Sequence, residues 1–322
     1  MVLQVHFDQH VSMSNWQSNH HGQNEFALQS PLDEQDSSSD DGRGTIVEYY
    51  SEKTRSLLQK YGPGPGVHFH IGYFNDDIVA PPHTSTPTEL RLILTESQRR
   101  TIAIAAEQWR AEHQFQGRLL DAGCGLGGGS IYWATHYPVE VTAVTIVPDH
   151  IPIIRQHAEE VGVGSRIHTV CSDVISFSPH DPSNVVVAME AACYWNLFKW
   201  FRHLAEDTAP GAIVCIEDTM LGHDRAKEPF DSYWHTNIVS RDTYVSAAAE
   251  AGFQLIDDVD ITDATTPFWD YSLAYNEAML RVTDISEGER QRLTRSSIAH
   301  ALMKELWNDH SIEVKLLLFK KN

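Results

Sequence analysis

Residues 119–129 read LLDAGCGLGGG, and this stretch decides the fold. Two apolar residues lead into Asp121, a run of glycines follows, and a helical pattern begins near Ser130. In doubly wound α/β sheets a ligand binds where a glycine turn follows the first strand and opens a helix. Glycines let a ligand approach the backbone closely, and Asp121 suits a ligand that carries a positive ammonium group.

Outward from this stretch the apolar pattern alternates between short strands and helices. Strands are expected at 118–121, 139–145, 167–170, 185–189, 212–217, 253–261 and 312–319, and helices at 46–61, 88–113, 151–161, 192–205, 244–251 and 286–307. Strand 185–189 is continuously apolar, which is typical of a strand buried on both faces of a parallel sheet. The alternation predicts an α/β fold, a doubly wound sheet with helices on both faces.

Residues 1–44 differ from the rest of the chain, because they hold seven acidic residues and one basic residue among mostly polar ones. Low hydrophobicity with charge of one sign predicts a mobile acidic arm. Its four histidines are either ordinary polar residues of the arm or metal ligands. We expect a helical segment over 45–117 and the ligand-binding core over 118–322.

The composition excludes several classes of partner. Lys and Arg number 24 against 44 Asp and Glu, a formal charge of −20, so nucleic acid and anionic membranes are not expected partners. The sequence shows no secretory signal and no membrane-length apolar run, which predicts a cytoplasmic protein. Cysteines at 124, 171, 193 and 215 show no CxxC or zinc spacing, so we expect reduced, mostly buried thiols.

The string at 119–129 resembles motif I of the class I S-adenosylmethionine-dependent methyltransferases, an apolar pair followed by (D/E)xGxGxG. The resemblance extends over about residues 45 to 320. It implies a Rossmann-like seven-stranded methyltransferase sheet with an N-terminal helical lid. It also implies that Asp121, Gly123, Gly125 and Gly127 bind the cofactor S-adenosylmethionine.

Two further segments are similar to cofactor motifs of that family. Asp173 and Val174 resemble the position where an acid takes the adenine amino group, and residues 209–212 resemble the turn before the fifth strand. The second strand ends in Thr145 and Ile146, where many relatives carry an acid for the ribose. This variant is similar to the sterol, tocopherol and prenyl C-methyltransferase branch, which implies cofactor contacts by Thr145, Ile146 and His150. His150 is otherwise a surface residue at a helix start.

Glu190 follows the apolar strand 185–189 and stands at the expected mouth of the crevice. It resembles the glutamate of sterol and geranyl diphosphate C-methyltransferases, which implies methylation at an alkene carbon with Glu190 as the catalytic residue. Such a transfer leaves a carbocation, which a carboxylate stabilises and a base deprotonates. The alternative is a carboxylate that only caps the next helix.

The segments around the expected lid are similar to bacterial geranyl or farnesyl diphosphate C-methyltransferases. The similarity rests on the tyrosine pair at 49–50, the HFH string at 68–70 and TTPFW at 265–269. The resemblance implies substrate contacts by Tyr49, Tyr50, His70, Tyr194 and Trp269. His68 and His70 either pack over the cofactor or bind a metal.

A diphosphate requires cations, and the segment after the fifth strand holds a concentrated basic set: His223, Arg225, Lys227, His235 and Arg241. We predict that Arg225 and Arg241 bind the substrate. Mg²⁺ accompanies the diphosphate in the similar branch. Two metal-linked positions of that branch differ here, because Val239 replaces a histidine and residues 51–55 replace an asparagine-rich stretch. No metal ligands are therefore assigned.

Together these residues predict an S-adenosylmethionine-dependent C-methyltransferase of terpenoid biosynthesis. Its substrate is a prenyl diphosphate of farnesyl or geranyl length, methylated at an alkene carbon through a carbocation, with or without cyclisation. One alternative is a methyltransferase for a neutral sterol, quinone or indole-type product. Another is a protein that binds the cofactor without transferring methyl. A homo-oligomer is compatible with the sequence, which does not fix the oligomeric state.

Overall fold

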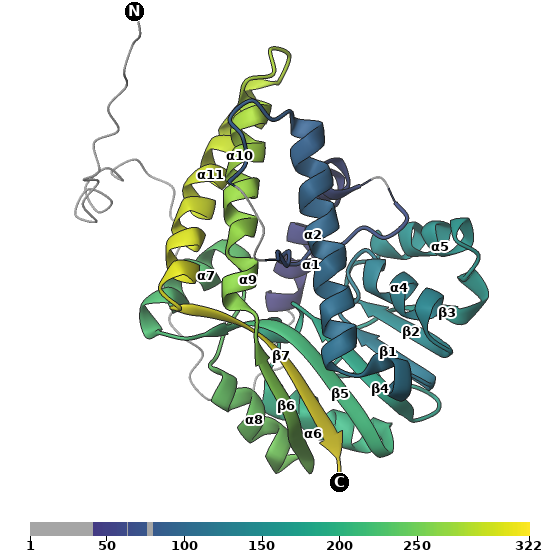
Figure 1. Cartoon of the computed structure of the whole chain (residues 1–322). Helices are drawn as coiled ribbons and strands as arrows, with labels where there is room; N and C mark the ends of the chain where they lie inside the picture. The colour runs from purple at the N-terminus through teal and green to yellow at the C-terminus, as the bar shows by residue number, and fades with distance from the viewer. Residues whose placement is uncertain (1–40, 63, 76–79) are drawn as a thin grey trace, which may run out of the picture. The chain divides into compact units, whose positions relative to one another are not determined.

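Seven strands form one sheet in the computed structural model, which describes residues 41–62, 64–75 and 80–322 (Figure 1). The strands are β1 Gly117–Ala122, β2 Val139–Thr145, β3 Ile167–Cys171, β4 Ser183–Met189, β5 Thr208–Leu221, β6 Phe253–Asp260 and β7 Ile312–Lys321. Their order across the sheet is β3-β2-β1-β4-β5-β7-β6. The order reverses at β1, so the turns after β1 and β4 meet at the same edge, where α/β sheets bind ligands.

The sheet is mixed. Strands β3, β2, β1, β4 and β5 pair in parallel, whereas β7 runs antiparallel to both β5 and β6. All seven expected strands are present, and β2 has the predicted bounds. The predicted doubly wound Rossmann-like sheet is therefore confirmed, with β7 inserted antiparallel between β5 and β6.

Helices cover both faces of the sheet and continue beyond its carboxyl edge. They are α1 Asp41–Tyr61, α2 Pro87–Gln108, α3 Ala111–Gln114, α4 Gly128–His136, α5 His150–Glu160, α6 Leu197–Asp207, α7 Lys227–Trp234, α8 Arg241–Glu250, α9 Thr262–Thr265, α10 Pro267–Leu280 and α11 Glu287–Asn308. One apolar cluster includes Trp133 of α4, and the other includes Trp200 of α6 and Tyr244 of α8. Helices α1, α2, α10 and α11 stand together beyond the strands (Figure 1).

A strap of residues 67–75 joins α1 to α2 and lies against the second helix. The backbone N–H of Tyr73 donates to the Ser97 carbonyl at 3.0 Å, and the Thr101 hydroxyl donates to the Ile71 carbonyl at 2.9 Å. The Gln98 side-chain amide donates to the His70 carbonyl at 2.8 Å. These bonds fix the strap over the edge where the glycine turn emerges.

Some helix predictions are wrong in their bounds. The helix expected over 88–113 is interrupted because Arg110 has φ 53°, in the left-handed region that ends an α-helix. The helix expected over 192–205 becomes a 3₁₀ turn, Ala192–Tyr194, followed by α6. Helices α7, α9 and α10 are additional to the prediction. The predicted arm, residues 1–44, lies almost wholly outside the described residues.

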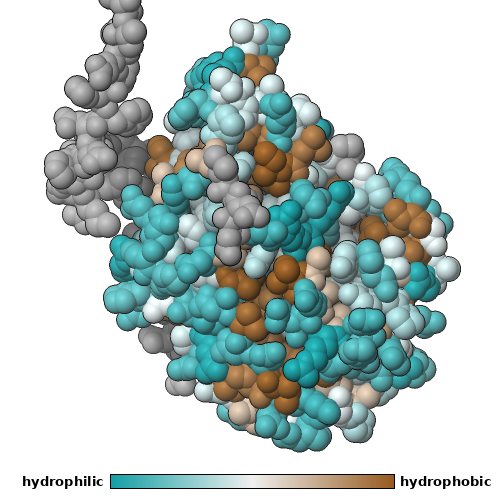
Figure 2. All heavy atoms as spheres, in the orientation of Figure 1, coloured by the Kyte–Doolittle hydropathy of each residue, from teal (hydrophilic) through white to brown (hydrophobic). Residues whose placement is uncertain are grey.

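The surface carries mostly hydrophilic residues on the visible face, with a broken band of hydrophobic ones down its middle (Figure 2). Leu92 of α2 and Ile298 of α11 are 60% and 62% exposed. Cys193 and Cys215 are buried as predicted, whereas Cys171 is exposed at the end of β3. Across the described residues, no helix combines the length and apolar character that a membrane span needs.

Thr86→Ala, just before α2, is expected to lower the free energy of unfolding by about 1 kcal/mol. Thr86 Oγ1 accepts the backbone N–H of Glu89 at 3.3 Å, and Glu89 Oε2 accepts the backbone N–H of Thr86 at 2.8 Å. Urea unfolding followed by circular dichroism measures the loss. Thr84→Ala in the preceding turn is the control, expected within about 0.5 kcal/mol of the parent protein. Equal losses in the two variants would contradict the cap.

Candidate active site

The glycine turn joins β1 to α4 and leaves one glycine beside open space. Gly123, Gly125 and Gly127 all have positive φ, at 75°, 52° and 81°. A Cβ on Gly123 would lie 2.6 Å from the Ala191 Cβ, and one on Gly127 would lie 2.7 Å from Ile154 Cγ1. A Cβ on Gly125 would meet nothing within 4 Å. The outer two glycines therefore allow close packing, and Gly125 presents bare backbone to a ligand.

Asp121 is a buried carboxylate at the end of β1. The Ser130 hydroxyl donates to its Oδ2 at 2.6 Å, and burial raises the pKa of Asp121 to about 6. Among the described residues no Lys, Arg or His forms an ion pair with it; the ion pairs of this part of the chain lie elsewhere. A buried carboxylate with one hydroxyl partner is suited to receive a cationic group from a ligand.

His150 begins α5 but is buried, so it is not the surface residue that the alternative interpretation expected. Its Nδ1 lies 3.4 Å from Thr145 Oγ1, and its Nε2 lies 3.1 Å from Thr54 Oγ1 of α1. Burial lowers the pKa of His150 to about 4, against the opposing effect of a hydrogen bond with the Gly125 backbone. The ring therefore connects α1, the end of β2 and the glycine turn.

The turns after β2 and β3 complete this edge. The backbone N–H of Ser172 donates to the Thr145 carbonyl at 3.0 Å, which ties the two turns together. Asp173 Oδ1 accepts the backbone N–H of Ile175 at 3.0 Å, and Val174 is buried. Ile146 is half-buried beside them. The residues predicted to bind the cofactor thus follow β1, β2 and β3, which are neighbours in parallel register.

Glu190 follows β4 with φ 42°, a left-handed conformation that is costly for any residue other than glycine. Its Oε1 accepts the backbone N–H of Ile71 in the strap at 2.8 Å. Burial, together with the charge of Asp218, raises the pKa of Glu190 to about 8, against the opposing effect of the hydrogen bond from the Ile71 backbone. Glu190 is therefore held rigidly between the sheet edge and the strap, and is not a helix cap.

Two more carboxylates, both within β5, lie beside Glu190, and the sequence analysis missed both. The backbone N–H of Glu190 donates to the Glu217 carbonyl at 2.8 Å, and both side-chain oxygens of Glu217 are buried without a hydrogen-bond partner among the described residues. Asp218 Oδ2 accepts from the backbone of Cys193 and from the Tyr244 hydroxyl. The sequence signal that could have identified them is the change from apolar residues at 212–216 to two successive acids.

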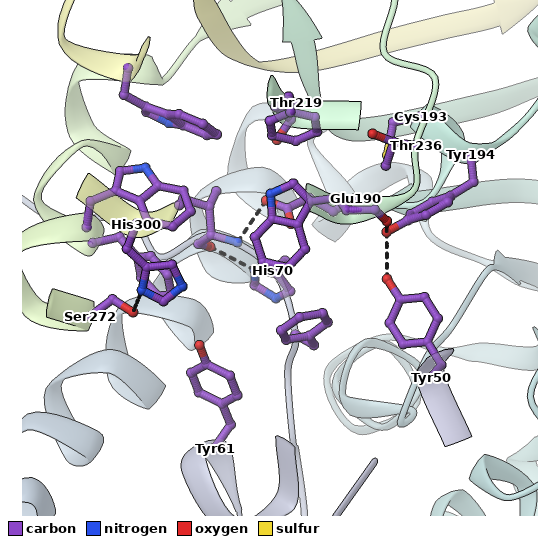
Figure 3. A pocket seen from close by; sticks show the side chains of 17 residues that line it. Tyr50, Tyr61, His70, Glu190, Cys193, Tyr194, Thr219, Thr236, Ser272 and His300 are labelled. Carbon is purple, nitrogen blue, oxygen red and sulfur yellow. Dashed lines mark hydrogen bonds between the residues drawn. The ribbon is translucent and has the colours of Figure 1, made fainter. Parts of the chain in front are cut away.

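A cavity opens beside Glu190, and aromatic side chains line most of it (Figure 3). Of the predicted substrate contacts, Tyr50, His70, Tyr194 and Trp269 line this cavity. The remaining lining residues are Tyr61, Phe69, Ile71, Cys193, Thr219, Phe230, Trp234, Thr236, Phe268, Ser272, His300 and Trp307. The Tyr50 and Tyr194 hydroxyls lie 2.6 Å apart on one side, with Ser272 and His300 on the other (Figure 3).

Tyr49 and His70, both predicted to contact the substrate, lie differently with respect to the cavity. Tyr49 does not line the cavity; its ring packs edge-on against His235 at 4.8 Å between centroids. His70 Nδ1 lies 2.9 Å from the Ile71 carbonyl, and its buried Nε2 has no hydrogen-bond partner among the described residues. Burial lowers the pKa of His70 to about 4, so the ring is neutral. The described residues contain no group of three or more His, Cys, Asp or Glu that could hold a metal.

The structure does not bring Arg225 and Arg241 to the cavity. Arg225 forms an ion pair with Asp309 and donates from Nε to Ser311 Oγ at 2.7 Å. Arg241 donates from Nε to Asp258 at 2.7 Å, on β6. Carboxylates from distant parts of the chain satisfy both guanidinium groups, so neither is placed to bind a diphosphate beside Glu190.

Comparison with known proteins agrees with this geometry. Residues 119–211 match the family model described as a methyltransferase domain. This part of the chain is therefore similar to a methyltransferase domain. The matched residues run from β1, which precedes the glycine turn, through Glu190 to the start of β5.

The curated proteins that the chain resembles differ in the atom that they methylate. The chain is 23% identical over 229 residues to O-methyltransferase cnsE of Penicillium expansum, covering 69% of this chain and 76% of the relative. It is also 23% identical over 248 residues to a geranyl diphosphate 2-C-methyltransferase of Saccharopolyspora erythraea, covering 70% and 82%.

A solved structure shares the fold. It is the geranyl diphosphate C-methyltransferase of Streptomyces coelicolor A3(2) in complex with Mg²⁺, geranyl diphosphate and S-adenosyl-L-homocysteine. The TM-score is 0.67 at 19% identity, and the alignment covers 87% of this chain and 98% of that one. At this identity the likeness concerns the fold, and it confirms the Rossmann-like methyltransferase sheet with its helices.

Proposed function

We propose that this protein is an S-adenosylmethionine-dependent C-methyltransferase that methylates an alkene carbon of a prenyl diphosphate of geranyl or farnesyl length. The observation that carries the proposal is Glu190, a buried carboxylate that faces an aromatic-lined cavity from the edge that holds the glycine turn. A cavity of this kind fits an apolar chain, and a carboxylate inside it is of use only when positive charge develops there.

The residues at the glycine turn fit the cofactor. Asp121 is a buried carboxylate without a cationic partner among the described residues, as an amino-acid ammonium group requires, and Gly125 borders open space. Asp173 and His150 are the candidates for the adenine and ribose contacts. When bound, S-adenosylmethionine supplies an electrophilic methyl group on a sulfonium, and its transfer to an alkene carbon leaves a carbocation on the substrate.

The chain's own residues supply what the cation needs. Aromatic faces such as those of Tyr50 and Trp269 stabilise positive charge without reacting with it. Glu190 stabilises the cation as a carboxylate and accepts the proton that restores a double bond. The strap closes over this region through its bond from Ile71, which excludes water that would otherwise add to the cation.

A second candidate is methylation of an uncharged sterol, quinone or indole-type substrate in the same cavity. The placement of Arg225 and Arg241 away from the cavity favours it, because the cations predicted to hold a diphosphate are engaged elsewhere. Mg²⁺ has no protein-built site of three or more ligands among the described residues, so other cations would have to meet the diphosphate charge.

Incubation with S-adenosylmethionine labelled in its methyl group separates the two candidates. We expect labelled product from geranyl or farnesyl diphosphate and none from the corresponding alcohols at equal concentration. Chromatography of the intact and dephosphorylated products measures the transfer. Labelled sterol, quinone or indole product with no labelled diphosphate would establish the second candidate instead.

A further inference from the structure

Helix α1 carries two lysines, Lys53 and Lys60, on the side that faces the cavity. They are seven positions apart, which is about two helical turns and hence one face of the helix. Lys60 Nζ donates to Ser272 Oγ at 2.8 Å, and Ser272 lines the cavity. Lys53 Nζ lies 5.4 Å from the ring centroid of Trp234, another lining residue, and donates to the Tyr49 hydroxyl.

Neither lysine forms an ion pair with a carboxylate within the described ranges; their hydrogen-bond partners there are hydroxyl groups. Other cations of the same part of the chain each meet an aspartate, namely Arg225, Lys227, Arg241, Lys304 and Lys315. Half-buried cations without a carboxylate are costly, and folded proteins usually pair them. These two therefore call for an anion that the described part of the chain does not supply.

The surroundings of the two lysines add positive charge and little negative charge. Burial, together with the charge of Arg292 on α11, lowers the pKa of Lys53 to about 8 and that of Lys60 to about 7. Arg292 itself pairs with Glu289 at 2.5 Å. The groups that face the lysines from α7, α10 and α11 are neutral: Tyr233, Tyr275 and His300.

Building on the proposed function, we propose that Lys53 and Lys60 form the subsite that binds the diphosphate of the prenyl substrate. The subsite lies at the end of the cavity marked by Ser272 and His300, across from the Tyr50–Tyr194 pair (Figure 3). The Ser272 hydroxyl, which lies 3.1 Å from His300 Nδ1, is placed to donate to the same anion.

This arrangement fixes the orientation of the substrate in the cavity. The anionic head lies against α1, α10 and α11, and the prenyl chain extends past the aromatic side chains toward Glu190. A diphosphate also restores the charge that burial removes from Lys60, because an adjacent anion raises the pKa of an ammonium group. Binding is therefore accompanied by proton uptake near pH 8.

The test measures binding of farnesyl diphosphate, and of inorganic pyrophosphate, by calorimetry in the presence of S-adenosyl-L-homocysteine. Lys53→Met and Lys60→Met are each expected to weaken both ligands by about tenfold. Lys60→Met is expected to remove the larger part of the proton uptake at pH 8, because Lys60 has the lower pKa of the two. Lys60→Arg should restore most of the affinity. The matched control is Lys199→Met on the exposed face of α6, which should bind as the parent protein does.

Circular dichroism and the affinity for S-adenosyl-L-homocysteine show whether each variant is folded. Unchanged affinity for farnesyl diphosphate in folded Lys53→Met and Lys60→Met overturns the subsite, even if the protein methylates prenyl diphosphates. Lysine-dependent binding without methyl transfer supports the subsite and overturns the proposed function. Equal weakening of neutral farnesol also overturns the subsite, because a lysine that only shapes the cavity affects both ligands alike.

Discussion

Glu190→Gln is expected to lower kcat by about 10³-fold while the affinity for S-adenosylmethionine stays within about twofold. Glutamine has the same shape, and its carbonyl oxygen can still accept the backbone N–H of Ile71 at the position of Oε1. The variant therefore keeps the strap in place and removes the negative charge and the base. Single-turnover formation of methylated product measures kcat, and calorimetry measures cofactor affinity.

The pH dependence distinguishes a base from a structural carboxylate at Glu190. Burial raises its pKa to about 8, so the carboxyl is mostly protonated at pH 7 in the absence of ligands. A base acts only when deprotonated, and kcat/KM for the cofactor is expected to rise about tenfold between pH 7 and pH 9. Bound sulfonium charge stabilises the carboxylate, so the apparent pKa in kcat should be lower.

Glu206→Gln on the exposed face of α6 is the matched control and should leave both kcat and the pH profile unchanged. If Glu190→Gln keeps more than about a tenth of the parent turnover with the same pH profile, Glu190 is not the base. The carboxylates Glu217 and Asp218 are then the next candidates, because both are buried beside it.

The fold followed from the sequence because each sheet strand carries a local signal. Strand β4 is a continuous apolar run, and the glycine turn marks where β1 ends. Helix α10 lacked such a signal, because half of its own residues are buried. Its sequence therefore does not alternate between an apolar and a polar face with the period of a helix. The break at Arg110 depends on a single left-handed residue, which composition does not reveal.

The site residues also differ in whether the sequence could predict them. Residues at strand ends, such as Asp121 and Glu190, could be predicted because parallel strands bring their carboxyl ends to one edge. The basic residues could not be assigned from their position in the chain, because their partners are remote in sequence. Arg225 meets Asp309, and Arg241 meets Asp258, whereas Lys60 is left with a hydroxyl partner. Charge in a sequence identifies candidates, and only the fold shows which are neutralised.

Asp121→Asn is expected to weaken binding of S-adenosyl-L-homocysteine by about 30-fold, within a range of about 10- to 100-fold. A hydrogen bond to a charged group contributes about 1.5–3 kcal/mol, and each 1.4 kcal/mol corresponds to tenfold in affinity. Asparagine still accepts the Ser130 hydroxyl but no longer offers a negative charge to the ligand's ammonium group. Calorimetry measures the affinity without any need for turnover.

The stability of the ligand-free protein separates a binding role of Asp121 from a structural one. Because burial raises the pKa of Asp121 to about 6, ionising this carboxyl costs folding free energy. The cost grows between about pH 4, the usual pKa of an aspartate, and pH 6, and it stays constant at higher pH. Asparagine carries no such cost, so Tm at pH 8 is expected to be equal to that of the parent protein or higher.

The affinity of the parent protein for S-adenosyl-L-homocysteine should fall as the pH drops below 6, where the carboxyl takes up a proton, and the variant should show no such fall. Asp181→Asn, which precedes β4 at the opposite edge of the sheet, is the control. Cofactor affinity equal to that of this control, or a Tm several degrees lower, would assign Asp121 a structural role and leave the ammonium group without its partner.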